Sequence, residues 1–256
     1  MSIFRDNVLE GRVAFVTGGG TGIGKEIART LGQHGAAVAI ASRKQDVIDA
    51  TTAELVGEGI HCIGLTCDVR DESAVEAVID AIIALLGGLH IVINNAAGNF
   101  PATLDNLSYN GFRTIVDIDL QGTYNVTKAA YEKALKEQGG VVVNIAAPFE
   151  HWGVTYQAHV AAAKTGVISL TRTCAVEWAG KGIRVNAVAP GYIDATEGVE
   201  RFNEVGDVND RGLKGSKQDI ANAVLFLATD AAGFISGECV RVDGASCVDM
   251  LKVAPQ

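Results

Sequence analysis

Residues 17–24 read TGGGTGIG and stand between an apolar run, Val13–Val16, and an amphipathic stretch, Lys25–Leu31. Strand, glycine-rich turn and helix form the setting in which such a pattern predicts dinucleotide binding. Glycine adopts positive φ and lets the backbone approach a pyrophosphate, while N–H groups at the helix start face anionic oxygens. A tight strand-to-helix turn without a ligand is the alternative.

The size and charge of the chain limit the kinds of protein it can be. Its 256 residues, 48% of them hydrophobic, are enough for the core of one α/β domain over residues 1–256. The net charge of −9 and the isoelectric point near 5.0 argue against a nucleic-acid partner or an anionic membrane surface. No uninterrupted run of about 18 apolar residues indicates a membrane span.

The cysteines bear on compartment and metal binding. Cys62, Cys67, Cys174, Cys239 and Cys247 show no zinc-type CxxC spacing, and we expect no metal site. An odd, scattered set, with no signal-peptide pattern in MSIFRDNVLEGR, predicts reduced thiols in the cytoplasm. The final KVAPQ differs from a peroxisomal address of the SKL type.

Short apolar runs alternate with helical patterns along the chain. We expect strands near residues 12–17, 36–41, 60–65, 89–94, 140–146, 183–189 and 238–242, and helices near 22–34, 45–57, 72–86, 109–137, 155–180 and 217–228. Runs such as Ala37–Ala41 are apolar on both faces, as in strands covered by helices on each side. The alternation predicts a single doubly wound Rossmann-type α/β domain, a parallel seven-stranded sheet with helices on both faces. Its ligand should lie beyond the carboxyl ends of the strands, at the topological switch point.

The end of the second predicted strand, Ser42-Arg43, bears on the choice of cofactor. NAD-selective sites usually place an acid here to bind the ribose 2′-hydroxyl, whereas a basic residue suits a 2′-phosphate. No carboxylate occupies the position, and Ser42 with Arg43 can form charge-assisted hydrogen bonds to phosphate. We therefore expect NADP(H); a solvated Arg-Lys pair at a helix start is the alternative.

Several motifs in a fixed order carry a resemblance that covers nearly the whole chain. TGGGTGIG, CDV at 67–69, NNAAG at 94–98 and PG at 190–191 resemble the short-chain dehydrogenase/reductase superfamily. The resemblance implies that Asp68 and Val69 hold the adenine, and that the long central helices pair chains into a homotetramer. Together with Ser42 and Arg43, the expected cofactor-binding residues are Gly18, Thr21, Gly22, Ile23, Gly24, Asp68, Val69, Asn95, Ala96, Ala97, Gly98, Lys164, Pro190, Gly191, Ile193 and Thr196.

The usual catalytic residues of that superfamily are largely replaced. Its members reduce carbonyls with a Tyr-x-x-x-Lys pair, a Ser and an Asn, and here only the lysine, Lys164, remains. Val160 stands at the tyrosine position, Ala147 at the serine position and Asp119 at the asparagine position. Valine has no proton to donate, so ordinary ketone reduction with the usual acid is not expected.

One branch of the superfamily has similar replacements. The stretches AAGNF at 96–100, DID at 117–119, HVAAAKTG at 159–166 and PGYIDATEG at 190–198 resemble 2,4-dienoyl-CoA reductases, above all peroxisomal-type and bacterial members that lack the tyrosine. The resemblance implies NADPH-dependent reduction of a 2,4-dienoyl-CoA to a 3-enoyl-CoA in the β-oxidation of unsaturated fatty acids. It makes an acyl-CoA the expected substrate and places Asn99, Phe100 and Ala147 against it.

This reaction explains why a tyrosine is dispensable. Hydride adds at Cδ of the dienoyl thioester, charge spreads through a dienolate to the thioester oxygen, and a proton adds at Cα. The chemistry needs stabilisation of the enolate oxygen and a proton source. We expect Lys164 to bind the nicotinamide ribose and add positive potential. We expect Asp119 to position a water as proton donor; a helix-capping or salt-bridged acid is the alternative reading of Asp119.

Two other side chains are candidate substitute acids. His159 lies about 140° from Lys164 around an ideal helix of ~3.6 residues per turn, so we expect a hydrogen-bonded structural role at the helix start or a subunit interface. Tyr156 is offset by about 80° if the helix extends that far, and packing is the alternative for its ring. Residues around 192–215 have little apolar periodicity and are expected to form a lid over the substrate.

Two other functions stay open at this point. A reductase or dehydrogenase for another substrate, with a displaced proton donor, would share the fold and the cofactor. A catalytically silent NADP-binding protein would keep the glycine loop and Lys164 as well. Turnover, rather than cofactor binding, separates these possibilities.

The assignment of the cofactor predicts the behaviour of Arg43→Ala. Loss of one charge-assisted phosphate contact costs roughly 1.5–3 kcal/mol, or about ten- to a hundredfold in affinity. We expect NADPH to bind the unsubstituted protein more tightly than NADH, and the variant to lose most of this preference in a fluorescence titration with both cofactors. Equal affinities before substitution would contradict the assignment.

Overall fold

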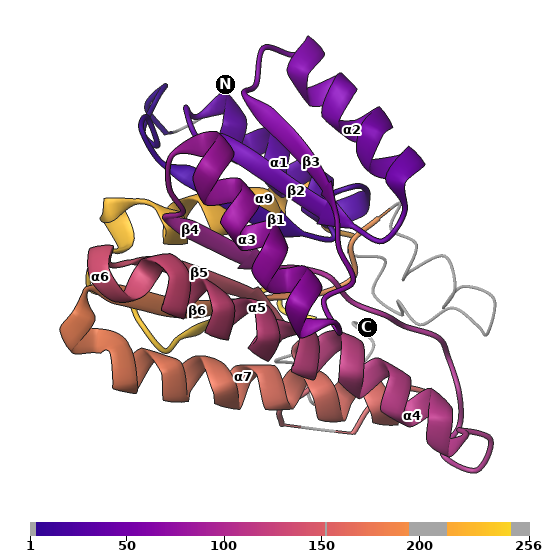
Figure 1. Cartoon of the computed structure of the whole chain (residues 1–256). Helices are drawn as coiled ribbons and strands as arrows, with labels where there is room; N and C mark the ends of the chain where they lie inside the picture. The colour runs from indigo at the N-terminus through magenta and orange to yellow at the C-terminus, as the bar shows by residue number, and fades with distance from the viewer. Residues whose placement is uncertain (1–3, 152, 195–213, 247–256) are drawn as a thin grey trace.

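The computed structural model describes residues 4–151, 153–194 and 214–246, and it confirms the predicted α/β architecture. One seven-stranded sheet has the strand order β3-β2-β1-β4-β5-β6-β7, with every pair of neighbours parallel (Figure 1). The strands are β1 (Val13–Thr17), β2 (Ala37–Ser42), β3 (Cys62–Thr66), β4 (Ile91–Asn94), β5 (Gly140–Ile145), β6 (Ile183–Pro190) and β7 (Cys239–Val242).

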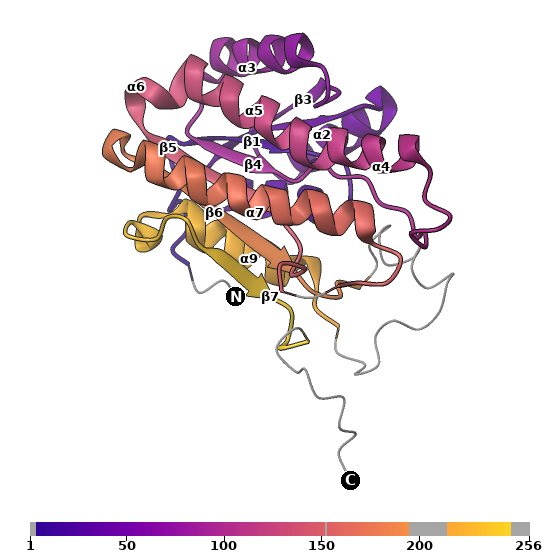
Figure 2. The ribbon, with the colours of Figure 1, turned by 90° about the horizontal axis from the view of Figure 1, so that it is seen from below.

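Helices cover both faces of this sheet (Figure 2). The helices α1 (Gly22–Gln33), α2 (Gln45–Gly57) and α9 (Lys217–Ala228) pack in one core layer, and α3 (Glu72–Leu86), α5 (Gly122–Ala130) and α7 (Ala158–Trp178) pack in the other. Successive residues of β1, Phe15 and Val16, are both completely buried, one in each layer. Strands enclosed in this way have no solvent face, which is why they read as continuous apolar runs.

The long central helix predicted for residues 109–137 contains two π-helical turns. It runs through α4 (Tyr109–Val116), η1 (Asp117–Gln121), α5, η2 (Tyr131–Leu135) and α6 (Lys136–Gln138). A π turn changes the angular spacing of the side chains along a helix, and such turns are frequent at functional sites. The side chain of Asp119, in the first π turn, is completely buried.

The helix that carries Lys164 begins later than predicted. We expected it from residue 155, but α7 starts at Ala158. Tyr156 has a φ of 66°, in the left-handed region, and a right-handed helix cannot pass through it. The predicted offset of about 80° between Tyr156 and Lys164, which assumed an ideal helix, therefore does not apply. The helix is followed by η3 (Ala179–Lys181), and a second 3₁₀ turn, η4 (Asp230–Ala232), follows α9.

Part of the predicted lid lies outside the described residues. Of residues 192–215, the structure describes 192–194 and 214–215. At these two ends Ile193 and Gly215 form an isolated parallel bridge, and the Ile193 side chain is 2% exposed. Thr196, expected at the cofactor, also lies outside the described residues.

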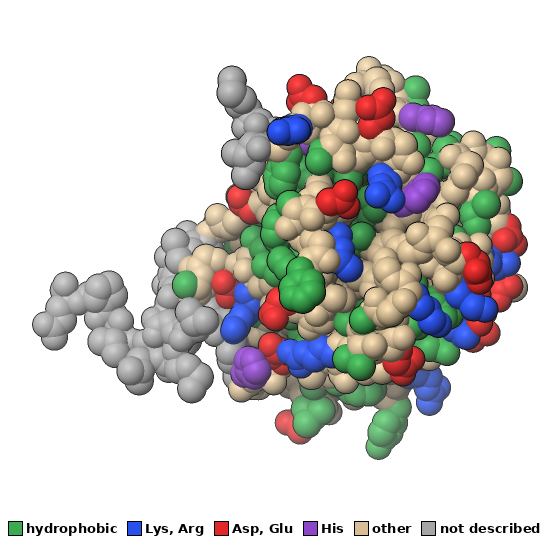
Figure 3. Space-filling model, turned by 90° about the vertical axis from the view of Figure 1, so that its left-hand side faces the viewer, with side chains coloured by type: hydrophobic (Ala, Val, Ile, Leu, Met, Phe, Trp, Pro, Cys, Tyr) green, Lys and Arg blue, Asp and Glu red, His purple; other side chains and the backbone are tan. Residues whose placement is uncertain are grey.

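Charged side chains are distributed over the surface. On the face in Figure 3, basic and acidic residues are interspersed in small groups rather than gathered into one field. Across the described part of the chain, no helix combines the length and the apolar character that crossing a membrane requires.

His90 joins the start of β4 to the start of β1. The Val13 N–H donates to His90 Nδ1 over 3.0 Å, so the ring is a neutral imidazole with its proton on Nε2. Burial, assisted by the positive charge of Arg12, lowers the pKa of His90. Because the folded-state pKa lies below that of the unfolded chain, acid favours the unfolded state, which binds the proton more readily.

This histidine predicts a pH dependence of stability. The free energy of unfolding should fall as the pH drops through the pKa of an unperturbed histidine, near 6.5, and level off below the folded-state pKa. His90→Asn keeps an acceptor near Nδ1 but does not titrate, so its pH dependence should be shallower. Urea unfolding between pH 5 and about 8 measures both curves; parallel curves would contradict the role of His90.

Candidate active site

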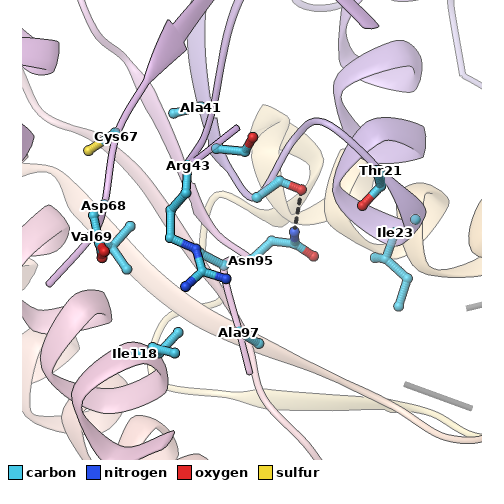
Figure 4. A pocket seen from close by; sticks show the side chains of 14 residues that line it. Thr21, Ile23, Ala41, Arg43, Cys67, Asp68, Val69, Asn95, Ala97 and Ile118 are labelled. Atoms are coloured by element: carbon cyan, nitrogen blue, oxygen red, sulfur yellow. Dashed lines mark hydrogen bonds between the residues drawn. The ribbon is translucent and has the colours of Figure 1, made fainter. Parts of the chain in front are cut away.

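A cleft of about 320 Å³ lies at the carboxyl ends of the strands, where the order turns from β1 to β2 on one side and to β4 on the other (Figure 4). This is the edge of the sheet at which the ligand was expected. The predicted residues that line it are Gly18, Thr21, Gly22, Ile23, Ser42, Arg43, Asp68, Val69, Asn95, Ala96 and Ala97. Ala41, Cys67 and Ile118 also line it; they bear no cofactor-binding chemistry that the sequence could have revealed.

The glycine loop is held in place by the end of β4. The N–H groups of Asn95 and Ala96 both donate to Thr17 Oγ1 over 3.0 Å, and Asn95 Nδ2 donates to the carbonyls of Thr17 and Gly18 over 3.0 and 3.2 Å. The packing of α1 against the turn leaves no room for a side chain on Gly24, because a Cβ there would lie 2.4 Å from the Gly18 carbonyl oxygen. The absence of a side chain on Gly24 therefore permits the close approach of helix α1 to the turn after β1.

The loop forms a cradle suited to a phosphate. Gly22 has a φ of 57°, and a Cβ placed on it would meet nothing within 4 Å, so the backbone borders open space. Helix α1 begins there, and the side chain of its N-cap, Thr21, forms no capping hydrogen bond. The first turn therefore has no side-chain cap, and its residues Gly22 and Ile23 line the cleft. Uncapped N–H groups at a helix start are suited to bind a pyrophosphate. These residues fit a dinucleotide such as NADP(H).

The far end of the cleft is polar. Arg70 Nε donates to Asp68 Oδ1 over 2.9 Å, and this hydrogen bond, with a contribution from the charge of Arg43, lowers the pKa of Asp68. In Figure 4 the Arg43 side chain extends into the pocket, between Asp68 and Val69 on one side and Thr21 and Ile23 on the other. The guanidinium of Arg43 thus places a positive charge in the cleft.

The cysteine in this cleft is not poised for nucleophilic chemistry. Burial, with the negative charges of Asp68 and Asp71, raises the pKa of Cys67 to about 11. At neutral pH the side chain is therefore a thiol, and the thiolate is the reactive form.

The two expected catalytic residues form a buried ion pair. Lys164 Nζ lies 3.4 Å from Asp119 Oδ2 and donates to the Ile145 carbonyl over 2.8 Å. Asp119 Oδ1 accepts from the Gly98 N–H over 2.7 Å. Asp119 therefore forms a salt bridge, as one of its two sequence-based interpretations predicted. The contacts of the pair connect α7 with η1, β5 and the loop after β4.

Asp119 holds a proton more readily than an exposed aspartate. Burial raises its pKa, and the charge of Lys164 and the hydrogen bond from Gly98 oppose this effect without cancelling it. Its second oxygen, Oδ2, faces Lys164 in the ion pair and has no other partner within the described residues. A buried acid with a raised pKa can pass a proton to a group or a water placed beside it.

The residue at the position of the usual tyrosine, Val160, is apolar and buried. Val160 is 5% exposed on the first turns of α7, one helical turn before Lys164. Ala147, at the serine position, lies directly after β5 and is partly buried. Neither side chain can donate a proton, so within the described site the proton must come from another group.

His159 is hydrogen-bonded at the helix start, as expected. Its Nε2 lies 3.0 Å from the Phe100 carbonyl oxygen, and the two rings are 4.5 Å apart. The loop after β4 contacts both His159, through the Phe100 carbonyl, and Asp119, through the Gly98 N–H. Burial lowers the pKa of His159.

The remaining predicted residues surround the cleft without lining it. Gly98 contacts the catalytic pair, and Phe100 packs on α7 through His159. Asn99 is partly buried beside them. Pro190 ends β6, and the Gly191 N–H donates to the Val242 carbonyl over 2.9 Å.

Comparison with known proteins agrees with this geometry. The model of the family described as enoyl-(acyl carrier protein) reductase matches residues 18–245. The peroxisomal 2,4-dienoyl-CoA reductase, (3E)-enoyl-CoA-producing, of Rattus norvegicus is 41% identical over 254 residues, which cover 95% of this chain and 86% of the relative. The chain belongs to the short-chain dehydrogenase/reductase superfamily.

Solved structures of this superfamily superpose over almost the whole chain. The citronellol catabolism dehydrogenase AtuB of Pseudomonas aeruginosa PAO1 has a TM-score of 0.86 at 36% identity, covering 96% of this chain and 99% of its own. The actinorhodin polyketide ketoreductase, solved with NADPH, has a TM-score of 0.85 at 30% identity, covering 95% and 99%. The protein is thus a short-chain oxidoreductase similar to 2,4-dienoyl-CoA reductases, in a superfamily that binds NAD(P)H.

The buried pair predicts an unusual stability pattern. Lys164→Met strands the Asp119 carboxylate, and breaking a buried pair costs about 3–5 kcal/mol. Without the lysine, the pKa of Asp119 should rise further above that of an unfolded aspartate, near 3.8. The loss should therefore grow as the pH rises from the unfolded-state pKa to the raised folded-state pKa, and stay constant above it. Asp119→Asn in the same chain should restore part of the stability in urea unfolding. No recovery in the double variant would show that the ion pair is not the cause.

Proposed function

We propose that the protein catalyses NADPH-dependent reduction of a 2,4-dienoyl-CoA to a 3-enoyl-CoA, a step in the β-oxidation of unsaturated fatty acids. The observation that carries the proposal is the replacement of a proton-donating tyrosine by buried Val160, one turn from a retained Lys164 paired with Asp119. The likeness to named dienoyl-CoA reductases at about 40% identity supports the same substrate class.

The residues suit a reaction that builds charge away from the carbon that receives hydride. Bound NADPH supplies the hydride for Cδ of the dienoyl thioester. The negative charge then resides on the thioester oxygen, where Lys164 would contribute positive potential in a water-poor site. Asp119, whose pKa burial raises, would direct a proton to Cα through a water.

The choice of NADPH over NADH rests on the end of β2. Ser42 and Arg43 line the cleft, and neither Ala41 nor Lys44 supplies a carboxylate to bind a ribose 2′-hydroxyl. The acyl group would lie against Asn99, Phe100 and Ala147. Residence in the cytoplasm and assembly into a homotetramer also stay predictions of the sequence.

Ketone reduction is the second candidate function. A likeness to a polyketide ketoreductase solved with NADPH favours it at the level of the superfamily. It requires a proton donor at the carbon that receives hydride, and Val160 and Ala147 supply none. A catalytically silent NADP-binding protein is the third possibility, and it predicts cofactor binding without turnover.

A screen of NADPH oxidation separates these functions. The protein should oxidise NADPH with a 2,4-dienoyl-CoA, and much more slowly with a 2-enoyl-CoA or a 3-ketoacyl-CoA. Asp119→Ala should lower kcat about a hundredfold, at the low end of general acid contributions, because bulk water partly substitutes. Asp119→Asn keeps size and hydrogen bonding, so it separates positioning from proton transfer. The absorbance of NADPH follows all reactions, with product analysis by mass spectrometry.

Faster turnover of the 3-ketoacyl-CoA would favour the ketoreductase, and binding without any turnover would favour the silent protein. Arg5→Ala, an exposed substitution at the N-terminus, serves as the control.

A further inference from the structure

Two buried polar atoms beside the candidate catalytic pair have incomplete hydrogen bonding. His159 Nδ1 has no hydrogen-bond partner among the described residues, and Asp119 Oδ2 has none beyond the Lys164 ammonium that it faces at 3.4 Å, although both residues are buried. Leaving such atoms unsatisfied is costly, and native proteins pair nearly all of them. A hydrogen-bond partner common to both atoms is therefore expected.

The tautomer of His159 shows what kind of donor is needed. Its Nε2 faces the Phe100 carbonyl oxygen over 3.0 Å, and a carbonyl oxygen can only accept, so the ring proton is on Nε2. Nδ1 is then a lone pair that can only accept as long as the imidazole is neutral. Burial favours the neutral form, because it lowers the pKa of His159.

Asp119 and His159 do not satisfy one another directly. No hydrogen bond joins Oδ2 to Nδ1. The same loop nevertheless holds both side chains, because the Gly98 N–H donates to Asp119 and the Phe100 carbonyl oxygen contacts His159. A water molecule can donate to Nδ1 and accept from a protonated Oδ2, and water is the usual bridge between buried polar atoms that do not meet.

We propose that Asp119 Oδ2 and His159 Nδ1 together hold one water molecule, and that His159 is a positioning residue for the proton source of the reaction. The catalytic part of this inference rests on the proposed dienoyl-CoA reduction. The water site itself depends only on the two side chains.

The proton balance of this arrangement closes. With Asp119 in its acid form, Oδ2–H donates a hydrogen bond to the water oxygen. One hydrogen of the water stays in a hydrogen bond to His159 Nδ1. The other hydrogen goes to Cα of the substrate as a proton, while the Asp119 proton moves to the water, which ends neutral. The substrate gains this proton and the hydride at Cδ. Asp119 is left as a carboxylate opposite Lys164 and takes a new proton from solvent.

Few charged groups act on this pair, so its pH dependence is defined. From α7, Lys164 and His159 face Asp119, and Asp119 from η1 is the charged group that faces His159. The loop after β4 contributes uncharged backbone groups, the Gly98 N–H and the Phe100 carbonyl. The acidic form of Asp119 is the proton-donating one, so kcat should fall as the pH rises through its pKa.

Two substitutions at His159 separate its two nitrogens. His159→Gln retains a donor for the Phe100 carbonyl but removes the acceptor at the Nδ1 position. His159→Asn supplies an acceptor near Nδ1 and gives up the Phe100 contact. With 2,4-dienoyl-CoA at saturating NADPH, we expect His159→Gln to lower kcat about ten- to a hundredfold with little change in KM. We expect His159→Asn to keep kcat within a few-fold and raise KM, because the loop bearing Phe100 loosens.

Controls separate these effects from misfolding. The Kd of NADPH should be unchanged in both His159 variants. Thermal melting should be unchanged in His159→Gln and should show only a small decrease in His159→Asn, which loses the Phe100 hydrogen bond. His61→Gln, an exposed substitution at the opposite end of the sheet, should match the unsubstituted enzyme. A His159→Gln variant with unaltered kcat, or a kcat loss of the same size in both His159 variants, would overturn the positioning role.

A spectroscopic measurement tests the water site without turnover. In ¹⁵N-histidine-labelled protein, His159 should be the Nε2–H tautomer at neutral pH, with an Nδ1 shift typical of a hydrogen-bond acceptor. Asp119→Ala should remove that acceptor signature while leaving the tautomer. An Nδ1–H tautomer, or an Nδ1 without a hydrogen bond, would overturn the inference. If the protein reduces no dienoyl-CoA, the proposed function fails, and this spectrum still decides the water site.

Discussion

A lysine ammonium and an aspartate carboxylate face each other 3.4 Å apart in the interior of this protein, at 6% and 1% side-chain exposure. Taking both charges out of water is expensive, and their attraction offsets the cost only when other hydrogen bonds complete the geometry. Here the Ile145 carbonyl accepts from Lys164 and the Gly98 N–H donates to Asp119. Helix α7, the π turn η1, strand β5 and the loop after β4 are therefore joined at one point.

The sheet beneath this pair is itself tied together by polar side chains. Asn94 and Asn144 are direct neighbours in the register of β4 and β5, and Asn94 Nδ2 donates to Asn144 Oδ1 over 2.8 Å. Asn94 also reaches Thr127 on α5, and Asn144 reaches Thr171 on α7, each over 2.8 Å. Buried hydrogen bonds of this kind require one arrangement of strands and helices. They set the position of α7, and with it the position of Lys164.

Different hydrogen bonds position the cleft and the catalytic pair, and both sets involve residues that follow β4. On one side, Thr17 and Asn95 fasten the glycine loop, whose open backbone suits a phosphate. On the other side, Gly98 anchors Asp119. Val160, at the position of the usual tyrosine, is buried within the same scaffold.

Much of this protein was determined by local sequence. The parallel α/β class, the two-sided burial and most element boundaries follow from apolar periodicity and from glycines at the β1–α1 turn, since these depend on neighbours in the chain. The lining of the cleft was expected from the glycine loop, from Ser42-Arg43 and from the resemblance of the ordered motifs to the superfamily. Tertiary structure alone decided the left-handed Tyr156 that delays α7, the π turn that buries Asp119, and the approach of His159 to Asp119. Each depends on packing between segments distant in sequence, and an ideal helical angle cannot describe a contact that two helices and a loop create together.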